Sequence, residues 1–377
     1  MRQALLHFGE PAPWFVAPCT SNPVFHFSSV GGRYVVLCFF QSAARAESRQ
    51  ILRDFLLAQS HFDDYNACFF GVSTDPDDQR LERVREQIPG IRFFWDFDRA
   101  VSRLYGAVVD SPVDAGAQSA EVVRPHTLLL DPLLRVVTTL PFGDSPETHV
   151  PRVLKALAEL PPVGPPTVAS PQAPVLIVPR VFEPELCRTL VQYYETHGGQ
   201  ESGFMRERNG MTVEVTDYGH KRRRDQEIAD ERLRHACMIR IHDRLVPEIH
   251  KAFQFRATRI ERYVVACYDA SVAGHFRAHR DNTTKGTAHR RFAVSLHLNT
   301  GEYEGGYLRF PEFGPQLYIA PMGGAVVFSC SLLHEATPVT RGLRFMFLPF
   351  LYDDQAARIR QQNLGFIEPS VSPPRPS

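Results

Sequence analysis

A proline-rich segment near the middle of the chain most limits how this chain can fold. Six prolines lie within 161–174, in the sequence PPVGPPTVASPQAP, which contains almost no large apolar residue. Proline fixes the backbone φ angle and has no N–H donor, so repeated prolines interrupt both helices and sheets. We predict a semi-rigid linker here, between a domain at 1–160 and a second domain that begins at 175. A second proline-rich segment, 367–377, is predicted to be an extended or disordered tail.

The composition indicates globular structure on both sides of the linker. The apolar fraction of 44% is enough for two hydrophobic cores. The 42 basic and 42 acidic side chains cancel, so no overall field attracts nucleic acid. No apolar run is long enough to cross a membrane, and the N-terminus has no apolar stretch of the signal-peptide kind. Seven scattered cysteines without a Cys-x-x-Cys pair fit reduced thiols. We therefore expect a cytoplasmic protein with neither a membrane nor a nucleic-acid partner.

The first domain is predicted to be of the α/β class. Two continuous apolar runs, at 34–40 (YVVLCFF) and 67–72 (ACFFGV), are typical of strands that are buried on both faces. Between them, apolar residues at helical spacing predict a helix over 48–60. Further strands are predicted at 127–130 and around 135–139. The order strand, helix, strand indicates a βαβ unit in this domain.

Several motifs of this domain resemble the peroxiredoxin branch of the thioredoxin fold, the AhpC/TSA family. They are Gly9-x-Pro11-Ala12-Pro13-x-Phe15, VVLCFF at 35–40, GVSTD at 71–75, Phe94 to Asp98, Tyr105-Gly106 and RPHTLLLD at 124–131. The resemblance implies a thioredoxin-like fold over most of 1–160.

The same resemblance exposes a departure from the family pattern. In that family a peroxidatic cysteine follows the first of these strands, whereas here 41–49 reads QSAARAESR and contains no cysteine. A thiol peroxidase needs a stabilised thiolate that can pass through a sulfenic acid. We therefore expect a non-catalytic domain that serves in docking, substrate presentation or formation of a homodimer. Cys19, Cys38 and Cys68 are expected to be small buried apolar residues.

The second domain is predicted to combine helices with a β-barrel. Apolar residues at three- and four-residue spacing predict a helix that starts at Glu183-Pro184 and ends at Gly198-Gly199, and a second helical pattern covers 228–253. The following pattern predicts an α+β domain at 175–356 with a double-stranded β-helix (jelly-roll) core flanked by helices. Its short apolar stretches, separated by turn residues, lie at 263–268, 292–298, 307–310, 325–328 and 345–351.

Within this barrel, three side chains form a candidate metal site. His279-Arg280-Asp281 places a histidine and an aspartate two residues apart, which on extended backbone puts both on one face. The distant His334 can complete the set from another strand. Two imidazoles and one carboxylate leave three positions open on an octahedral metal, as in the facial triad of non-haem Fe(II) oxygenases.

The residues around this site resemble the prolyl 4-hydroxylase branch of the 2-oxoglutarate/Fe(II) dioxygenases. A lone His-x-Asp pair is common by chance. Here it is followed, in order, by Asn299, Glu304-Gly305-Gly306, Leu308, Phe310, Pro321-Met-Gly-Gly324, His334 and Arg344. The resemblance implies that His279, Asp281 and His334 bind Fe(II) and are catalytic. It implies 2-oxoglutarate and O₂ as co-substrates, with ascorbate as an accessory reductant.

The resemblance also assigns a co-substrate site. It places Arg344 on the distal carboxylate of 2-oxoglutarate, where the planar guanidinium can donate two parallel N–H bonds. Arg341 is a competitor three residues earlier; we favour Arg344 because Phe345 and Phe347 would then point to the opposite face of the strand. Tyr268 lies where relatives can hydrogen-bond the co-substrate, and packing in the barrel wall is an equal alternative for it.

The resemblance implies a dioxygenase that hydroxylates a peptidyl or amino-acid C–H bond, with a proline-like substrate as one candidate, and releases succinate and CO₂. The carboxylate of Asp281 favours hydroxylation, since related halogenases have a small residue at that position. Small molecules, peptides and proteins all remain candidate substrates. The alternative is a catalytically inactive interaction or scaffold protein built from two degenerate domains.

Two other interpretations of local motifs are weaker. His275, His279 and His289 could suggest zinc, but Gly274 interrupts the helical pattern that such spacing needs. Lys-Arg-Arg-Arg at 221–224 could contact nucleic acid, but acidic residues follow at once, so we expect a solvated loop.

Overall fold

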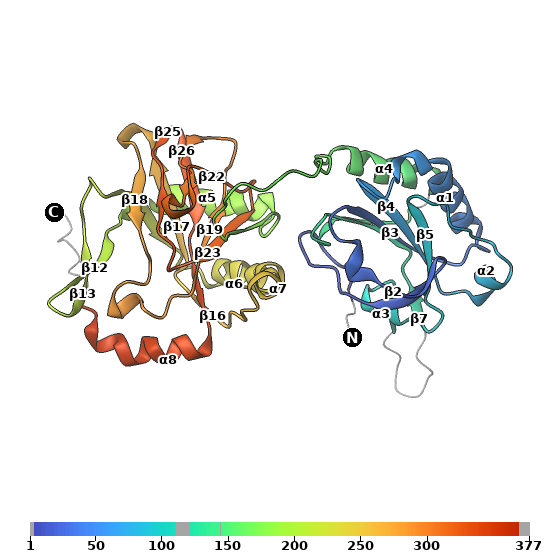
Figure 1. Ribbon diagram of the computed structural model, residues 1–377, viewed down its shortest axis with the longest axis horizontal. Helices are drawn as coiled ribbons and strands as arrows, with labels where there is room; N and C mark the ends of the chain where they lie inside the picture. Colours follow the sequence, from blue (N-terminus) through green and yellow to red (C-terminus); the bar gives the residue numbers. More distant parts are fainter. Residues whose placement is uncertain (1–3, 111–120, 144, 369–377) are drawn as a thin grey trace. The chain divides into compact units, whose positions relative to one another are not determined.

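The computed structural model describes residues 4–110, 121–143 and 145–368. The chain divides into two compact units, Met1–Thr167 and Val168–Ser377, and each unit contains a β-sheet with helices (Figure 1). The predicted tail at 367–377 lies outside the described residues from 369 onward. In the described ranges, no helix is both long and apolar enough to cross a bilayer.

The first unit is built around a seven-stranded sheet. Its strand order is β2-β1-β5-β4-β3-β8-β9, in which β4 pairs in parallel with both β3 and β5. A separate two-stranded sheet joins β6 and β7. The strands are β1 Val16–Cys19, β2 Asn22–His26, β3 Tyr34–Gln41, β4 Ala67–Ser73, β5 Ile91–Trp95, β6 Val108–Asp110, β7 Glu121–Val123, β8 His126–Leu130 and β9 Val136–Pro141. The helices are α1 Ala46–Leu57, α2 Pro76–Arg80, α3 Ala100–Leu104 and α4 Pro146–Ala158.

Both faces of this sheet are covered, which explains the continuous apolar runs of β3 and β4. On one face, Val36 of β3 belongs to a buried cluster with Phe55 of α1 and Val153 of α4. On the other face, Phe39 and Tyr105 belong to a second cluster. The predicted α/β class of this unit is confirmed, as are its βαβ order and the positions of its main strands.

The second unit layers helices onto two sheets. The larger sheet has the order β10-β23-β19-β26-β17-β15-β11, with β16 and β27 attached, and the smaller has the order β14-β18-β24-β21-β22. The larger sheet contains β10 Leu176–Val178, β11 Gln200–Glu201, β15 Arg224–Glu227, β16 Arg259–Glu261, β17 Val264–Asp269, β19 Phe292–His297, β23 Ala325–Ser329, β26 Leu343–Phe347 and β27 Phe350–Tyr352. The smaller sheet contains β14 Lys221–Arg222, β18 His275–His279, β21 Leu308–Arg309, β22 Leu317–Tyr318 and β24 His334–Ala336.

The remaining strands of this unit form two pairs, and its described residues include four α-helices besides shorter helical turns. The strand pairs are β12 Phe204–Arg208 with β13 Met211–Val215, and β20 Glu304–Gly305 with β25 Val339–Arg341. The helices are α5 Pro184–His197, α6 Glu231–Arg240, α7 Val246–Phe253 and α8 Asp354–Asn363.

The two sides of the larger sheet pack against different partners. Phe347 of β26 shares a buried cluster with Leu190 of α5 and Ile249 of α7. Met346, the next residue, lies in another cluster with Phe276 of the smaller sheet. The layers are therefore helices, larger sheet and smaller sheet, which confirms the predicted β-rich fold with flanking helices.

The helical pattern predicted at 228–253 contains a local change of geometry. A π-helical turn, Ile241–Leu245, separates α6 from α7. Pro247, near the start of α7, has no N–H group with which to bond a carbonyl of the preceding turn, which favours this irregular turn.

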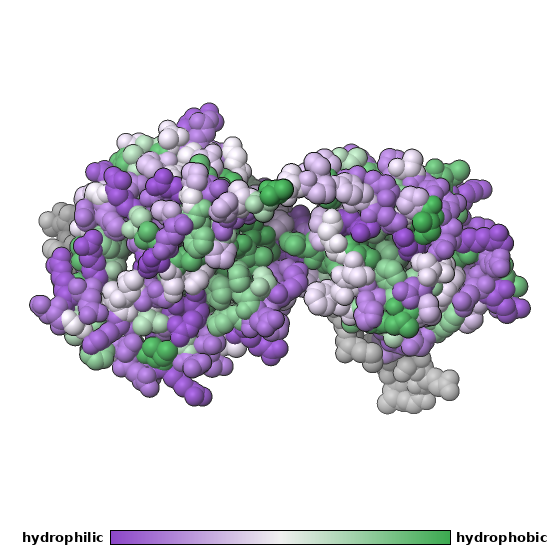
Figure 2. Space-filling model, viewed as in Figure 1, coloured by the Kyte–Doolittle hydropathy of each residue, from purple (hydrophilic) through white to green (hydrophobic). Residues whose placement is uncertain are grey.

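Residues 161–174 form neither a helix nor a strand. Pro161 and Gly164 accept hydrogen bonds from Tyr34 and Tyr65 of the first unit. Ala173 donates to the Tyr318 hydroxyl of the second. In the view of Figure 2, polar and charged residues cover most of each unit and apolar ones form scattered groups.

Candidate metal centre

Three potential metal ligands meet in the second unit. β18 ends at His279 and β24 begins at His334, and these two histidines are direct cross-strand partners. The ligand atoms of His279, Asp281 and His334 all lie within 4.8 Å of one another, and among the described residues no other group of three metal-ligating side chains does so. The sequence predicts His279 and Asp281 on one strand; the structure instead places Asp281 in the turn after β18, where its N–H donates to Cys330 O at 3.0 Å.

Hydrogen bonds to the backbone fix the orientation of both imidazoles. His279 Nδ1 lies 2.7 Å from Arg277 O, and His334 Nδ1 lies 3.0 Å from Leu332 O. A carbonyl oxygen can only accept, so Nδ1 must hold the proton in each ring and Nε2 of the neutral ring presents a lone pair. These Nε2 atoms lie 3.5 and 3.4 Å from the carboxylate oxygens of Asp281. Lone pairs and an anion at this separation repel one another unless a cation lies between them.

The protonation states agree with this geometry. Burial, and then the neighbouring His279, lower the pKa of His334 to about 4, so its ring is neutral at physiological pH. Burial alone would raise the pKa of Asp281, but His334, His279 and Arg290 hold it below the ordinary aspartate value. A neutral imidazole and an ionised carboxylate are the forms that bind a metal. The donor set of two imidazole nitrogens and one carboxylate thus fits Fe(II).

The three side chains line a cavity of about 1100 Å³, to which both sheets contribute. Aromatic rings pack against the two histidines. The Phe276 ring stacks on His279 with centroids 3.5 Å apart, and Phe328 lies 4.5 Å from His334. These contacts restrict rotation of the imidazoles and keep apolar surface beside the centre.

Arg344 lines the same cavity from β26. It is 1% exposed, and its Nε and Nη2 atoms have no hydrogen-bond partner among the described residues. Its cross-strand partner is Tyr268, whose ring centroid lies 4.9 Å from the guanidinium carbon. The Tyr268 hydroxyl is 3.4 Å from Nη1 of Arg223. A buried guanidinium with unused N–H donors is suited to bind the carboxylate of a ligand.

Gly306 makes room for this arginine. Its φ is +64°, and a Cβ atom at this position would lie 2.5 Å from Cδ of Arg344. Any other residue would therefore displace the guanidinium or strain the backbone.

The competing residues lie elsewhere. Arg341 is exposed and pairs with Glu304 at 2.7 Å. His275 is bonded to the carbonyl of Ala273, and His289 is paired with Glu261. None of these side chains belongs to the three-residue group, so the geometry gives no support to a zinc site built from them.

The basic run at 221–224 differs most from its predicted structure. It is not a solvated loop, because Lys221 and Arg223 are 4% and 6% exposed and line the cavity. The run occupies the ends of β14 and β15, where alternate side chains face opposite sides. Asp225, which has the same parity, accepts from Arg223 Nε at 2.7 Å. That alternation is the signal by which these residues could have been found.

His297 is a second residue that sequence reasoning missed. It is fully buried, its Nδ1 lies 3.0 Å from the Tyr303 hydroxyl, and its Nε2 has no partner in the part of the chain that the structure describes. Burial, and then the charge of Arg344, lower its pKa well below the ordinary histidine value. This histidine is therefore neutral near Arg344.

The three cysteines in the described part of the first unit lie in its interior. Cys19, Cys38 and Cys68 are buried. Burial raises the pKa of Cys38 and of Cys68 to about 12. In the segment at the start of α1, Ser42 instead donates a hydrogen bond to Asp75 at 2.6 Å.

Two family models match the chain, one in each unit. Residues 8–138 match the AhpC/TSA family, and residues 263–352 match the 2OG-Fe(II) oxygenase superfamily, whose name refers to 2-oxoglutarate (2OG) and ferrous iron. The chain therefore joins an N-terminal AhpC/TSA peroxiredoxin-like domain to a C-terminal 2OG-Fe(II) oxygenase domain. The second domain contains a candidate His-Asp-His facial triad.

Individual proteins show the same two likenesses. The chain is 30% identical over 96 residues to PKHD-type hydroxylases from two Synechococcus strains, JA-2-3B'a(2-13) and JA-3-3Ab; the match spans 24% of this chain and 42% of each relative. Peroxiredoxin Q of Xanthomonas campestris is 20% identical, with a TM-score of 0.34 over 42% of this chain and 98% of that one. A Pseudomonas putida prolyl-4-hydroxylase is 17% identical, with a TM-score of 0.36 over 48% and 93% of the two chains.

Proposed function

We propose that this protein is a 2-oxoglutarate- and Fe(II)-dependent dioxygenase that hydroxylates a C–H bond and releases succinate and CO₂. The observation that supports this most directly is the meeting of two Nε2 lone pairs with the carboxylate of Asp281, inside a cavity that also contains Arg344. The match to the oxygenase superfamily and to proteins called hydroxylases is in agreement.

In this proposal His279, Asp281 and His334 hold the metal. Bound Fe(II), with O₂ and 2-oxoglutarate, supplies the oxidising power that breaks the C–H bond. The Nδ1 protons of the two histidines are bonded to backbone carbonyls, which leaves Nε2 of each ring to face the metal. Asp281 contributes the negative charge, and three coordination positions stay open for co-substrate and O₂.

Arg344 binds the distal carboxylate of 2-oxoglutarate in this proposal. Its Nε and Nη2 donors are buried and unused. A carboxylate that binds there leaves water but gains hydrogen bonds from these N–H groups. Tyr268 restrains the guanidinium by stacking, and its hydroxyl is a candidate second contact to the co-substrate. Phe276 and Phe328 exclude water beside the two histidines. Ascorbate is proposed as an accessory reductant.

The first unit is proposed to bind rather than to catalyse. The segment 41–49 has no cysteine, and the two thiols nearest in sequence, Cys38 and Cys68, have raised pKa values. Docking of substrate and formation of a homodimer are the roles that we propose for it. We also propose that residues 161–174 link the two domains and that the substrate is a small molecule, a peptide or a protein. We propose a cytoplasmic location, with neither nucleic acid nor membrane as a partner.

The test uses the full chain and two readouts. Purified protein is expected to bind Fe(II) in equilibrium dialysis and to release CO₂ from 2-oxoglutarate. Asp281→Ala removes the only carboxylate of the described ligand group, so both signals should fall to background. Asp243→Ala, at an exposed position on the π-helical turn, should leave both unchanged. A wild-type protein that binds no Fe(II) and is inert toward 2-oxoglutarate would favour the scaffold alternative.

A further inference from the structure

One wall of the cavity bears more basic than acidic groups. We call it the cationic wall; its members are Lys221, Arg223, Arg262, Arg290, Asp225 and Glu261. The four basic residues come from separate positions around β14 to β19, so the cluster is assembled by the fold. Five other charged residues that line the cavity, Glu201, Arg206, Glu207, Glu214 and Glu227, are exposed to solvent, where their charge is screened. Arg280 pairs with Glu312, and Asp281 and Arg344 belong to the proposed metal and co-substrate sites.

The two carboxylates of the wall are shared among several donors. Asp225 accepts from Nη2 of Arg223 at 2.6 Å and from Nη2 of Arg262 at 2.9 Å. Glu261 accepts from Nη2 of Arg290 at 2.8 Å and also pairs with His289. Each guanidinium brings a full positive charge, so the two carboxylates do not balance the three arginines.

Lys221 donates hydrogen bonds to neutral oxygens only. Its Nζ donates to Ser202 Oγ at 2.7 Å and to the carbonyl of Gly203, both of which are neutral.

Arg262 is the member with the most donors left for a ligand, whereas Arg290 donates to Glu261 through Nε and Nη2 and has only long contacts of 3.5 Å at Nε and Nη1 that a ligand could replace. The single hydrogen bond of the Arg262 guanidinium within the described residues is the one to Asp225. Both guanidinium groups lie against the ring of Phe350, with Cζ at 5.7 and 4.0 Å from its centroid, which restricts their orientation. Arg262 also has a φ of 69°, a conformation that non-glycine residues rarely adopt and that occurs often at functional sites.

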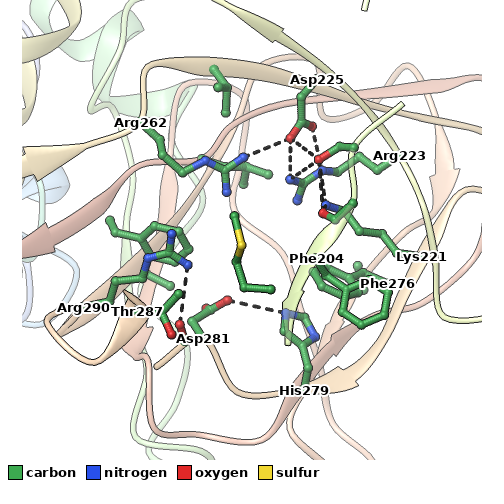
Figure 3. A pocket seen from close by; sticks show the side chains of 18 of the residues that line it. Phe204, Lys221, Arg223, Asp225, Arg262, Phe276, His279, Asp281, Thr287 and Arg290 are labelled. Carbon is green, nitrogen blue, oxygen red and sulfur yellow. Dashed lines mark hydrogen bonds and ion pairs between the residues drawn. The ribbon is translucent and has the colours of Figure 1, made fainter. Parts of the chain in front are cut away.

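The side of the cavity that faces Arg262 and Arg290 combines aromatic rings with Lys221, whose Nζ lies 5.0 Å from the centroid of the Phe276 ring. Figure 3 shows Arg262 and Arg290 on one side, Phe204 and Phe276 on the other, and Asp281 at the base between them. Arg290 also lies 3.5 Å from the carbonyl oxygen of Asp281, so the cationic wall reaches the metal centre.

We propose that the substrate presents a carboxylate to Arg262 and Arg290 while its aliphatic part lies between the aromatic side and the metal centre. The proposal rests on the dioxygenase function above. A carboxylate matches the planar fork of an arginine through two parallel N–H bonds and offsets the excess positive charge. The carboxylate can belong to a free amino acid or to the C-terminal residue of a peptide.

The experiment measures binding rather than turnover. Full-length protein is loaded with Fe(II) and saturating 2-oxoglutarate without oxygen, so that the co-substrate site is filled. It is then titrated calorimetrically with L-amino acids and short peptides that have a free C-terminal carboxylate, and with the same compounds as amides. We expect a free acid to bind about ten- to a hundredfold more tightly than its amide. Whether amino acids or peptides bind identifies the source of the carboxylate.

Substitutions of Arg262 test whether this residue causes the preference for acids over amides. Arg262→Met should remove most of the preference for the acid over the amide, with Arg290 keeping the remainder, while 2-oxoglutarate affinity is unchanged. Arg262→Lys should keep more of the preference than Arg262→Met. Arg341→Met is the matched control, because Arg341 is exposed and pairs with Glu304 outside the cavity; it should keep the full preference. Thermal melting of each variant verifies that it is folded.

Equal affinity for acids and amides, binding of no acid, or an unchanged preference in Arg262→Met would overturn the proposal. Loss of 2-oxoglutarate binding in Arg262→Met would also overturn it, by assigning this arginine to the co-substrate. A wild-type protein that binds neither Fe(II) nor 2-oxoglutarate contradicts the dioxygenase function instead. In that case the same panel is titrated into the metal-free protein, where the preference for acids is still expected.

Discussion

Asp96 of the first unit is buried and the side chain of Asp281 in the second unit is 12% exposed, and these two aspartates differ in what surrounds them. Asp96 of the first unit accepts hydrogen bonds from the backbone N–H groups of Val101 and Ser102, at 2.9 and 2.7 Å. Asp281 of the second unit faces the Nε2 atoms of His279 and His334 instead. A carboxylate among N–H donors organises a turn, whereas a carboxylate among lone pairs requires a cation. The contrast separates a structural site from a candidate catalytic one.

Removal of a histidine ligand should have the largest effect on the candidate metal centre. His279→Ala should reduce CO₂ release from 2-oxoglutarate to below about one hundredth of wild type, since even residues that only support a ligand change metal affinity or activity by about 10–100-fold. His275→Ala is the control, because His275 lies on the same strand but outside the ligand group. Normal succinate output from His279→Ala would remove the proposed role of the triad.

The chemistry of the first unit can be tested through its thiols. With pKa values of about 12, Cys38 and Cys68 are thiolates only near that pH, so at pH 8 their alkylation should be on the order of a thousandfold slower than that of a free thiol. Mass spectrometry after iodoacetamide treatment of native and denatured protein measures this difference. Rapid labelling of either thiol in native protein, or consumption of peroxide by the full chain, would contradict the assignment of this unit to binding.

The co-substrate site should respond less strongly than the metal ligands. Arg344→Met should weaken 2-oxoglutarate binding about 10–100-fold, because a charge-assisted bidentate contact is lost. Fe(II) affinity in equilibrium dialysis should stay near wild type, which separates this effect from loss of the metal. Arg341→Met should change neither quantity, and an equal effect of the two variants would refute the assignment of Arg344.

The smallest expected effect concerns an ion pair that stabilises only the second unit. Glu183 bonds Arg240 at 2.6 Å and Arg244 at 2.7 Å. Burial alone would raise its pKa, but the two arginines lower it from 4.5 to about 2. The carboxylate therefore stabilises the fold above pH 4.5, and this contribution disappears as the pH falls toward 2. Glu183→Gln should cost about 1–2 kcal/mol at pH 7 and little at pH 2.

The tryptophans make this effect assignable to one unit. Trp14 and Trp95 are the only tryptophans of the chain, and both lie in the first unit. Tryptophan fluorescence thus follows the first unit, whereas far-UV circular dichroism follows both. Only the dichroism transition should shift in Glu183→Gln, and neither should shift in Glu185→Gln, whose ion pair with Arg188 is exposed. A fluorescence shift in Glu183→Gln would show that the units unfold together.

Much of the fold follows from local patterns. β3 and β4 are continuous apolar runs because both faces of the first sheet are covered. The proximity of His279 and His334 was predictable from residue types and order, although Asp281 lies in a turn rather than on the strand. Arg344 lies in the cavity because residues of opposite parity on β26, such as Phe345, pack toward the helices.

The cationic wall could be predicted only in part, from the alternation of side chains at 221–225. Four consecutive basic residues at 221–224 suggest exposure, since burying an unpaired charge is costly. Lys221 and Arg223 tolerate burial because Ser202 and Asp225 are brought beside them. Arg262 and Arg290 join the wall from more distant parts of the chain, through contacts that only the tertiary structure provides. Local patterns indicate which residues can face inward, but not which partners they will meet.

The backbone bonds of the two histidines have a consequence for mutational tolerance. His279 and His334 each bond the carbonyl of the residue two positions earlier, Arg277 and Leu332. Every amino acid supplies that carbonyl, so replacing either side chain leaves the acceptor in place. Many metal sites orient a histidine with a second side chain, which adds a position that must not vary. Here the hydrogen bonds to Nδ1 add no such position, so Arg277 and Leu332 can be replaced without loss of these acceptors, whereas Phe276 and Phe328, which pack on the rings, are less free to change.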